Sequence, residues 1–372
     1  MRILHTESSV NWGGQEYRAL EQMEWLQDHG HEPALAVRPG SDIGRRARAK
    51  GLPVFDIAYT GHYDLWAIKA ARNLIKQQGI EIADCHGSRD VMTFAFSRSL
   101  IPVIRTRHVS QPLKNKLHRR LQWRYGSDHV IATASCIRDE VLSKGLAPAS
   151  KISVVGEWAG DAFFDLSRKE DYQRDVRREF AVPADQPLVC AVGMLRGDKA
   201  QEFLIDAVAE LKRRGRNVVA LIVGSVTNSQ SSYDQKLMSR ANQLGVMQAI
   251  RFTGYREDIP RLTQACDAQV ITSISVEAQS RTVPQAFASM TPVVASRVGG
   301  IEELVVDQKT GILVGIGDVL AYASALTDVL DNRNKTDHMV SSARTFAEHN
   351  LRLDNKMAET VAIYEDLTRQ RR

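Results

Sequence analysis

Two polar side chains flank the start of a predicted helix in the last third of the chain. Glu277 follows the apolar run AQVITS, and Gln285 lies inside the helix expected at residues 282–290. Carboxylate and amide groups of this kind can hydrogen-bond sugar hydroxyls. The glycine pair 299–300 opens a further helix, whose first backbone N–H groups can face a phosphate. The spacing therefore indicates a pocket for a nucleotide sugar.

Two other segments carry groups suited to a phosphate. Gly13 and Gly14 follow the apolar run RILHT and open a predicted helix, so a ligand can approach the backbone closely at a helix N-terminus. The alternative is a plain tight turn. Arg196 and Lys199 follow the run VCAVG, where two cations would neutralise a diphosphate. The alternative for these two is a charged pair on a solvated loop.

Two histidines end predicted strands in the first half of the chain. His108 ends PVIRTRH and His86 ends IADCH, so both imidazoles are expected at one edge of a sheet. Histidine at such an edge suits a polar contact to a reacting sugar, with His86 as the candidate on the acceptor side. Either one can instead be a satisfied structural histidine. His5 has no comparable position in the pattern.

Parallel strands joined by helices are expected to position these residues. Apolar runs alternate with helical patterns along nearly the whole chain, which predicts an α/β fold with buried parallel strands. The charged stretch near 165–185 interrupts the pattern. It separates a Rossmann-like doubly wound domain at 1–165, onto which a helix at about 352–372 packs back, from a second such domain at 186–351. Because ligands bind at strand carboxyl ends, we expect the domains to face a central cleft.

Composition and charge exclude several classes of protein. With 43% apolar and 25% charged residues over 372 positions, the chain is typical of soluble globular proteins of two domains. Its four cysteines form no Cys-x-x-Cys pair, so neither disulfides nor zinc are expected. The N-terminus is unlike a signal peptide and no apolar run approaches ~20 residues, which favours the cytoplasm. We expect no nucleic-acid partner.

A basic stretch lies at residues 113–125. The net charge is +5, too small by itself to select a partner. The stretch predicts a basic amphipathic helix that makes peripheral contact with an anionic membrane, or an ordinary surface helix with a solvated face. Its basic and apolar residues are Leu113, Lys114, Lys116, Leu117, Arg119, Arg120, Leu121, Trp123, Arg124 and Tyr125.

Several motifs are missing from the sequence. It contains no Asp-x-Asp, so the usual carboxylate pair for a metal-bridged diphosphate is absent and no metal site is expected. It also lacks G-x-G-x-x-G, the P-loop pattern and G-x-S-x-G, which disfavours a nicotinamide oxidoreductase. We expect no bound cofactor.

Together these segments resemble a retaining glycosyltransferase of the GT-B fold, family 4, across nearly the whole chain. The resemblance implies transfer of a sugar from a nucleoside-diphosphate sugar to an acceptor hydroxyl, without a metal. It also implies a glycan or lipid-linked acceptor, in bacterial lipopolysaccharide or polysaccharide biosynthesis. The matching segments are Gly13–Gly14, His108, VGMLRGDKAQEFLIDAV, VVALIVG, IRFTGYREDIP, and EAQSRTVPQAFASMTPVVAS with GGIEELV and QKTGILV.

The resemblance also assigns roles to single residues. Glu277 matches the glutamate near the transferred sugar, and Gln285 stands where the family has a second glutamate on the nucleotide ribose. Lys199 and Arg196 match the cations that hold the diphosphate, and His108 matches the active-site histidine. Further residues expected to bind the donor are Gly13, Gly14, Gly193, Tyr255, Arg256, Gln279, Ser280 and Arg281.

Three departures from the family pattern leave other functions open. Gln285 replaces a glutamate, Met194 stands where many members have arginine so that Arg196 must substitute, and Ala200 replaces the glycine after the lysine. The alternatives are a sugar-nucleotide epimerase of the same fold and a non-catalytic sugar-nucleotide-binding protein.

Overall fold

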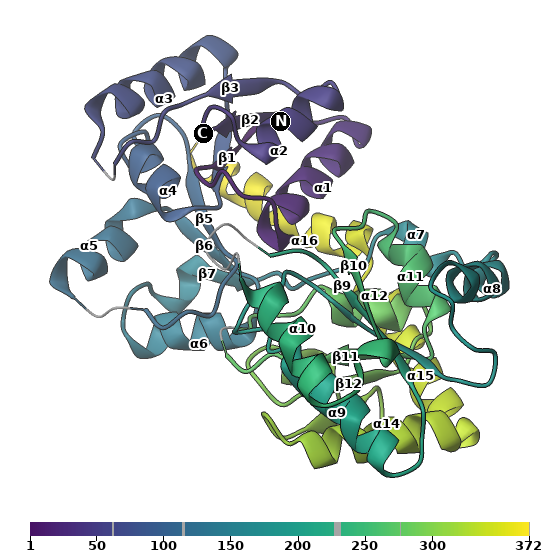
Figure 1. Ribbon diagram of the computed structural model, residues 1–372. Coiled ribbons are helices and arrows are strands. Elements are labelled where there is room, and N and C mark those ends of the chain that lie inside the picture. The colour runs from purple at the N-terminus through teal and green to yellow at the C-terminus, as the bar shows by residue number, and fades with distance from the viewer. Residues whose placement is uncertain (62, 114–115, 227–231, 276, 372) are drawn as a thin grey trace. The chain divides into compact units, whose positions relative to one another are not determined.

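The computed structural model describes residues 1–61, 63–113, 116–226, 232–275 and 277–371 (Figure 1). Contacts divide the chain into two compact units. The first comprises Met1–Gly156 together with Lys356–Arg372, and the second comprises Glu157–Asn355. The charged stretch near 165–185 lies in the second unit, where Val176 anchors it by packing in a core cluster with Leu188 and Leu262.

The first unit contains a seven-stranded parallel sheet in the order β3-β2-β1-β4-β5-β6-β7. The order changes direction between β1 and β4, and such a switch point places a ligand crevice beyond the strand carboxyl ends. Its strands are β1 (Arg2–Glu7), β2 (Glu32–Val37), β3 (Val54–Asp56), β4 (Ile82–Cys85), β5 (Val103–Arg107), β6 (His129–Ala132) and β7 (Ile152–Val154). Its helices are α1 (Gly14–Asp28), α2 (Asp42–Ala49), α3 (Leu65–Gln78), α4 (Ser88–Ala95), α5 (Leu117–Gly126), α6 (Ser135–Ser143), the 3-10 turn η1 (Ala149–Lys151) and most of α16 (Leu353–Arg369).

The second unit contains a six-stranded parallel sheet in the order β10-β9-β8-β11-β12-β13, with its switch point between β8 and β11. Its strands are β8 (Leu188–Val192), β9 (Val219–Val223), β10 (Ile250–Gly254), β11 (Ala268–Ile271), β12 (Val293–Ser296) and β13 (Ile312–Val314). Its helices are α7 (Asp161–Phe164), α8 (Lys169–Glu179), α9 (Glu202–Arg213), α10 (Tyr233–Gln243), the 3-10 turn η3 (Met247–Ala249), α11 (Ile259–Ala265), α12 (Thr282–Ala288), α13 (Ile301–Leu304), α14 (Val319–Asp331) and α15 (Arg333–Asn350).

The strands form where the sequence is continuously apolar. Every residue of β9, VALIV, is buried, because helices cover both faces of a parallel sheet. The helices contribute one apolar face each; in α9, Leu204, Val208 and Leu211 pack in the main core cluster. The prediction of two doubly wound parallel-sheet domains is confirmed.

The last helix belongs to the first unit although it is last in the sequence. In Figure 1, α16 is the yellow helix beside the purple elements of that unit. Tyr364 of α16 is fully buried and donates a hydrogen bond from its hydroxyl to Asp84 of β4 at 2.6 Å. Among the described residues, no helix combines the length and the apolarity that crossing a bilayer requires.

Candidate functional site

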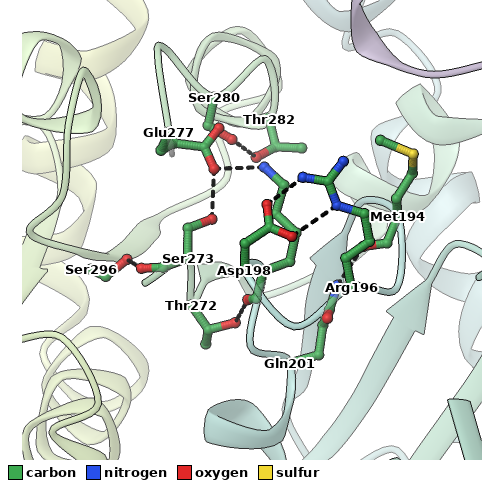
Figure 2. Close-up of polar contacts among 11 residues, drawn as sticks. Met194, Arg196, Asp198, Gln201, Thr272, Ser273, Glu277, Ser280, Thr282 and Ser296 are labelled. Atoms are coloured by element: carbon green, nitrogen blue, oxygen red, sulfur yellow. Dashed lines mark hydrogen bonds and ion pairs between the residues drawn. The ribbon is translucent and has the colours of Figure 1, made fainter. Parts of the chain in front are cut away.

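Two loops meet at the switch point of the second sheet, one after β8 and one after β11 (Figure 2). The hydroxyl of Thr272 donates to the backbone carbonyl of Lys199 at 2.7 Å. The backbone N–H of Ile274 donates to the carbonyl of Asp198 at 3.0 Å. These contacts hold the side chains that project from the two loops in fixed relative positions, so the site is preorganised.

The loop after β8 is also stabilised by a hydrogen bond between two of its own residues. The amide of Gln201 donates to the carbonyl of Met194 at 3.0 Å, across seven positions of the chain. Ala200 has a φ of +48°, a left-handed conformation that glycine adopts without strain and alanine does not. The replacement of the family's glycine by Ala200 therefore costs free energy of folding in this loop.

Glu277 is the centre of the polar cluster at these loops. Its carboxylate accepts a hydrogen bond from Nζ of Lys199 at 2.6 Å and one from the hydroxyl of Ser273 at 2.7 Å. The side chains of Lys199 and Glu277 are only 25% and 8% exposed. Because the pair is largely withdrawn from water, its charges act on a bound ligand more strongly than surface charges would.

Arg196 has a carboxylate partner of its own. Its Nε donates to Oδ1 of Asp198 at 2.8 Å, and its Nη2 pairs with Oδ2 of the same residue. The hydrogen bonds to Asp198 raise the pKa of Arg196 above its usual value. Burial alone would raise the pKa of Asp198, but the guanidinium outweighs it and the pKa is lowered. The sequence predicted that Lys199 and Arg196 hold a diphosphate. In the structure each cation is already paired with a carboxylate, so a diphosphate must share the cation with this carboxylate or displace it.

The glycine pair 299–300 supports the backbone of Glu277. Gly299 has a φ of +54°, and a Cβ atom built there would lie 2.0 Å from the backbone oxygen of Glu277. The N–H of Gly300 donates to that same oxygen at 3.2 Å. The expectation that this pair offers its N–H groups to a phosphate is therefore wrong for Gly300, because the protein itself uses that donor.

A small cavity lies beside the Lys199–Glu277 pair. Its volume of about 20 Å³ is enough for one water molecule at most. The hydroxyls of Ser280 and Thr282 hydrogen-bond each other at 3.0 Å in its wall. Gly193, which directly follows β8, donates its N–H to the carbonyl of Val223 of β9 at 2.9 Å. The residues that line the cavity are Ala191, Val192, Lys199, Gln201, Val270, Ile271, Thr272, Ser273, Ser280 and Thr282.

Sequence reasoning missed several of these polar residues. Asp198 stands between the two cations, and Thr272 and Ser273 directly follow β11. Their position is the signal that could have identified them, since side chains just past the carboxyl ends of neighbouring parallel strands converge.

Three other predicted donor-binding residues lie after β11 or in α12. Gln279 accepts from the backbone N–H of Glu157 at 2.9 Å and donates to the carboxylate of Glu303 at 2.9 Å. Arg281 faces the Glu157 carboxylate at 3.4 Å. Gln285 is half-buried within α12. Gln279 and Arg281 therefore connect the chain that follows β11 to Glu157, where the second unit begins.

Tyr255 and Arg256 lie farther from the switch point. They follow β10, which β9 separates from β8 in the sheet order. Arg256 is held by ion pairs of 2.8 Å with Glu179 and 2.7 Å with Asp258, and these hydrogen bonds raise its pKa. Tyr255 is half exposed. Arg256 is thus held by two carboxylates, Glu179 and Asp258, which the sequence did not identify as its partners.

The two predicted histidines of the first unit are neighbours, and a third joins them. Nδ1 of His86 lies 2.9 Å from Nε2 of His108, and Nε2 of His86 lies 2.9 Å from Nδ1 of His5. Burial lowers the pKa of His5 to about 3 and lowers the pKa of His86. His5 was missed because its strand position became informative only once β1 was known to lie beside β4.

Asp84 completes this buried cluster. Its carboxylate accepts hydrogen bonds from the hydroxyls of Thr106 at 2.5 Å and Tyr364 at 2.6 Å. Burial opposes ionisation, but His86, His5 and the two hydroxyls outweigh it and lower the pKa of Asp84. One ligand atom each from His5, Asp84 and His86 lie within 4.8 Å of one another, a donor set that metals use. In the structure these donor atoms face one another or hydroxyl groups in hydrogen bonds.

The glycine turn at Gly13 and Gly14, which was predicted to bind a phosphate, lies next to the carboxylate of Glu16. Gly13 is the N-cap of α1, which begins at Gly14. The side chain of Glu16 accepts hydrogen bonds from the backbone N–H groups of Glu16 and Gly13 and from the hydroxyl of Ser9, while burial raises its pKa. An anion that binds this helix N-terminus must therefore compete with Glu16.

A pH dependence of stability follows from the carboxyl groups next to this turn. Burial, with the charges of Asp90 and Glu16, raises the pKa of Glu7 from 4.5 to about 8. The folded state thus holds a proton that the unfolded chain has released, so stability is lost as pH rises toward 8. The depressed pKa of His5 acts oppositely, but only below about 6.5. From pH 6.5 to 8 we expect a loss of about 1–2 kcal/mol, at ~1.4 kcal/mol per proton and pH unit.

Urea unfolding at pH 6.5 and 8 measures this loss. Glu7→Gln keeps an uncharged amide for the contacts from Gln15 and Ser9, so its stability should not fall over this interval. Glu32→Gln, at an exposed position of β2, is the control and should behave as the wild type. An equal pH dependence in the Glu7→Gln variant would contradict the assignment.

The sequence matches known proteins in both units. Residues 12–157 match the model of Glycosyltransferase Family 4, and residues 173–346 match that of Glycosyl transferases group 1. An uncharacterized glycosyltransferase of Methanocaldococcus jannaschii is 25% identical over 367 residues, which cover 92% of this chain and 91% of the relative.

Solved structures share the fold. A glycosyltransferase from Rickettsia africae superposes with a TM-score of 0.87 at 18% identity, covering 98% of both chains. Anabaena HepE, solved in complex with UDP and glucose, gives a TM-score of 0.86 at 20% identity, covering 98% of this chain and 99% of HepE. With both sheets and both family models in agreement, the chain belongs to the group 1, family 4 glycosyltransferases of the GT-B fold.

Proposed function

We propose that the chain transfers a sugar from a nucleoside-diphosphate sugar to an acceptor hydroxyl with retention of configuration. The observation that supports this most is the preorganised cluster of Lys199, Glu277 and Ser273 at the switch point of the second sheet. Arg196 lies in the same loop as Lys199 and adds a second cation. A diphosphate leaving group requires cations held in such fixed positions.

The chemistry needs no covalent intermediate with the protein. As the bond between the sugar and the diphosphate breaks, negative charge grows on the diphosphate. The acceptor hydroxyl attacks from the same face and gives its proton to an oxygen of the departing diphosphate. Lys199 has three N–H donors, so it can bind a phosphate oxygen while one donor still contacts Glu277. Glu277 would accept from a sugar hydroxyl, and His108 would orient the sugar. On this proposal the cations replace a metal.

Other residues would bind the nucleotide part of the donor. Gln285 would hydrogen-bond the ribose through its amide, and Gly14 would donate its backbone N–H to a phosphate. The remaining residues proposed to bind the donor are Gly13, Gly193, Tyr255, Arg256, Gln279, Ser280 and Arg281. Glu16 would leave the helix N-terminus when the phosphate binds.

A donor screen tests the proposal. Thermal unfolding is measured with UDP, GDP and ADP and with their sugars, starting from UDP-glucose because HepE was solved with UDP and glucose. We expect one nucleoside diphosphate to raise the melting temperature and its sugar to be consumed only with an acceptor. Consumption without acceptor would instead indicate an epimerase, and binding without any turnover a non-catalytic protein. No shift with any of these compounds would contradict the proposal.

We further propose a glycan or lipid-linked acceptor at the cytoplasmic face of a bacterial membrane. The support is an exposed surface of the first unit. Leu117 of α5 is 75% exposed and Trp66 of α3 is 80% exposed. Tyr63 connects these helices, since its hydroxyl accepts from Gln122 of α5 at 3.0 Å. Aromatic and aliphatic side chains with arginines around them suit an anionic lipid surface.

The predicted basic helix contributes only part of its residues to this surface. Leu117, Leu121 and Tyr125 are exposed, whereas Leu113 and Trp123 are buried in a core cluster. The Trp123 ring packs against the guanidinium of Arg105 at 4.3 Å. Lys114, part of the predicted stretch, lies outside the described residues. The exposed face of α5 is therefore narrower than the sequence pattern indicated.

Vesicle binding tests this surface. Replacing Trp66 and Leu117 together with serine should weaken binding to vesicles of phosphatidylglycerol at least tenfold, because each apolar side chain that enters the bilayer is worth about 1.5–3 kcal/mol. Leu320→Ser removes a leucine of α14 in the second unit that is 59% exposed, and it should have no effect. Unchanged sedimentation of the double variant with the vesicles would count against this face.

A further inference from the structure

Three histidines of the first unit form one hydrogen-bonded row. His5 lies in β1, His86 follows β4 and His108 follows β5, and these three strands are neighbours in the sheet. Both nitrogen-to-nitrogen distances in the row are 2.9 Å. The row runs from the fully buried His5 to the half-buried His108. What His108 can do for a ligand depends on which of its nitrogens carries the hydrogen.

The row has only two consistent arrangements of hydrogen atoms. A neutral imidazole has one N–H and one lone pair. If Nδ1 of His5 donates, then Nε2 of His86 accepts, so Nδ1 of His86 carries a hydrogen and donates to Nε2 of His108. The hydrogen of His108 is then on Nδ1. In the other arrangement every hydrogen lies on the opposite nitrogen, and that of His108 is on Nε2.

The buried end of the row selects between the two. Nε2 of His5 is buried and has no hydrogen-bond partner among the residues that the structure describes. In the first arrangement this atom is a lone pair, and in the second it is an N–H group. Buried N–H groups without a partner are rarer than buried acceptors without one, since an acceptor loses less. The first arrangement is therefore the more stable.

Burial keeps His5 and His86 neutral, so the choice between the two arrangements applies to them at neutral pH. Burial is the main cause that lowers the pKa of both His5 and His86, with Asp84 acting in the opposite direction on each. Arg18, whose guanidinium donates to the backbone carbonyls of Val155 and Gly156, further disfavours a proton on His86.

We propose that His5 and His86 are positioning residues that hold the hydrogen of His108 on Nδ1. Nε2 of His108 lies 2.9 Å from Nδ1 of His86 and would accept its hydrogen, so the hydrogen of His108 would lie on Nδ1. His108 would then present an N–H donor there, and it cannot remove a proton through that atom. This consequence rests on the proposed function: His108 would donate to a sugar oxygen and orient it, rather than act as a base.

Nitrogen NMR of the side chains tests the row without any substrate. The protein is labelled with ¹⁵N-histidine, and the protonated and bare ring nitrogens are distinguished by their shifts. Signals are assigned by the losses in the His86→Gln and His108→Gln variants. We expect His86 and His108 both to carry hydrogen on Nδ1. A hydrogen on Nε2 of His108 in the wild type would overturn the proposal.

Two variants of His5 test its control over the row. His5→Asn places an amide N–H close to the position of Nδ1 and should keep the pattern. His5→Leu removes the donor, so His86 and His108 should show a mixture of both hydrogen positions. An unchanged pattern in His5→Leu would overturn the proposal. So would Zn²⁺ found bound to Nε2 of His86 in the protein as purified, because His5, Asp84 and His86 would then be metal ligands.

A matched control separates the row from general packing. His129→Leu changes a half-buried histidine of the neighbouring strand β6, which hydrogen-bonds Ser153 at 2.9 Å and is not part of the row. It should leave the hydrogen positions of His86 and His108 unchanged. Thermal unfolding of each variant confirms that it folds.

Activity provides the second readout. With an identified donor, His5→Leu should lower kcat roughly tenfold with little change in KM, by analogy with other losses of an orienting partner of a histidine, and His5→Asn should restore most of it. Equal kcat values for wild type and His5→Leu would contradict a positioning role. If the wild type turns over no donor at all, the proposed function is contradicted. The NMR pattern still tests separately whether the hydrogen of His108 lies on Nδ1.

Discussion

Replacing Lys199 with alanine is expected to lower kcat for donor turnover about a hundredfold, because removing one preorganised donor to developing charge costs ~3 kcal/mol of barrier. The loop that holds Lys199 is fixed by hydrogen bonds from residues 272 and 274 to the carbonyls of Lys199 and Asp198, and Arg196 of the same loop is held by Asp198. The measurement is the steady-state rate of release of the nucleoside diphosphate with a saturating acceptor.

Two further variants make this result specific. Lys212→Ala removes a cation of the same unit that donates only to the carbonyl of Gly245 at 2.9 Å, and it should leave kcat unchanged. Lys199→Arg keeps the charge and should retain more activity than Lys199→Ala. Because the alanine variant leaves the carboxylate of Glu277 without its cation, its melting temperature must be recorded as well. A folded Lys199→Ala variant with kcat within threefold of the wild type would contradict the proposal that Lys199 stabilises the departing diphosphate.

The second large effect is expected at Gly299. Alanine there must adopt a φ of +54°, and its Cβ would lie 2.0 Å from the backbone oxygen of Glu277, so this backbone has to move. We expect a loss of about 2–4 kcal/mol in stability, the sum of a left-handed alanine and an overpacked contact. Because the displaced residue is Glu277, donor turnover should fall together with stability.

The control for Gly299 is another glycine of the same unit. Gly215 has a φ of +80°, but a Cβ atom there would have no heavy atom within 4 Å. Gly215→Ala should therefore cost only the left-handed strain, about 1 kcal/mol, and leave turnover unchanged. Urea midpoints and kcat are compared for both variants. Equal losses in the two would show that the contact with Glu277 has no energetic role.

The sequence predicted the fold well because the fold depends on local signals. Short continuous apolar runs rich in β-branched residues, such as VALIV, favour strands of a sheet covered on both faces, and the helices between them favour parallel order. The places of Lys199 and Glu277 in loops that follow strands β8 and β11 were also expected from the sequence, because each follows an apolar run. Their contact was not, because it depends on β8 and β11 being neighbours in the sheet.

Other parts of the site could not be predicted because they depend on which strands become neighbours. His5 joins His86 only because β1 and β4 pair, with His5 opposite Asp84 in register. The carboxylate partners of the cations depend on loop conformation, as for Asp198 beside Arg196. Likewise, nothing in the local sequence shows that Gly300 donates to Glu277. Contacts of this kind arise from tertiary packing, which apolar periodicity does not encode.

The return of α16 to the first unit has a consequence for biosynthesis. A ribosome makes the chain from its N-terminus, so β4 and Asp84 are available long before Tyr364, with the whole of Glu157–Asn355 translated in between. Until α16 has been translated, Asp84 lacks one of its two hydroxyl donors, and the surface that later receives α16 stays open to other nascent or chaperone segments. Of the two units, the one that contains β4 therefore begins to emerge first and is completed last.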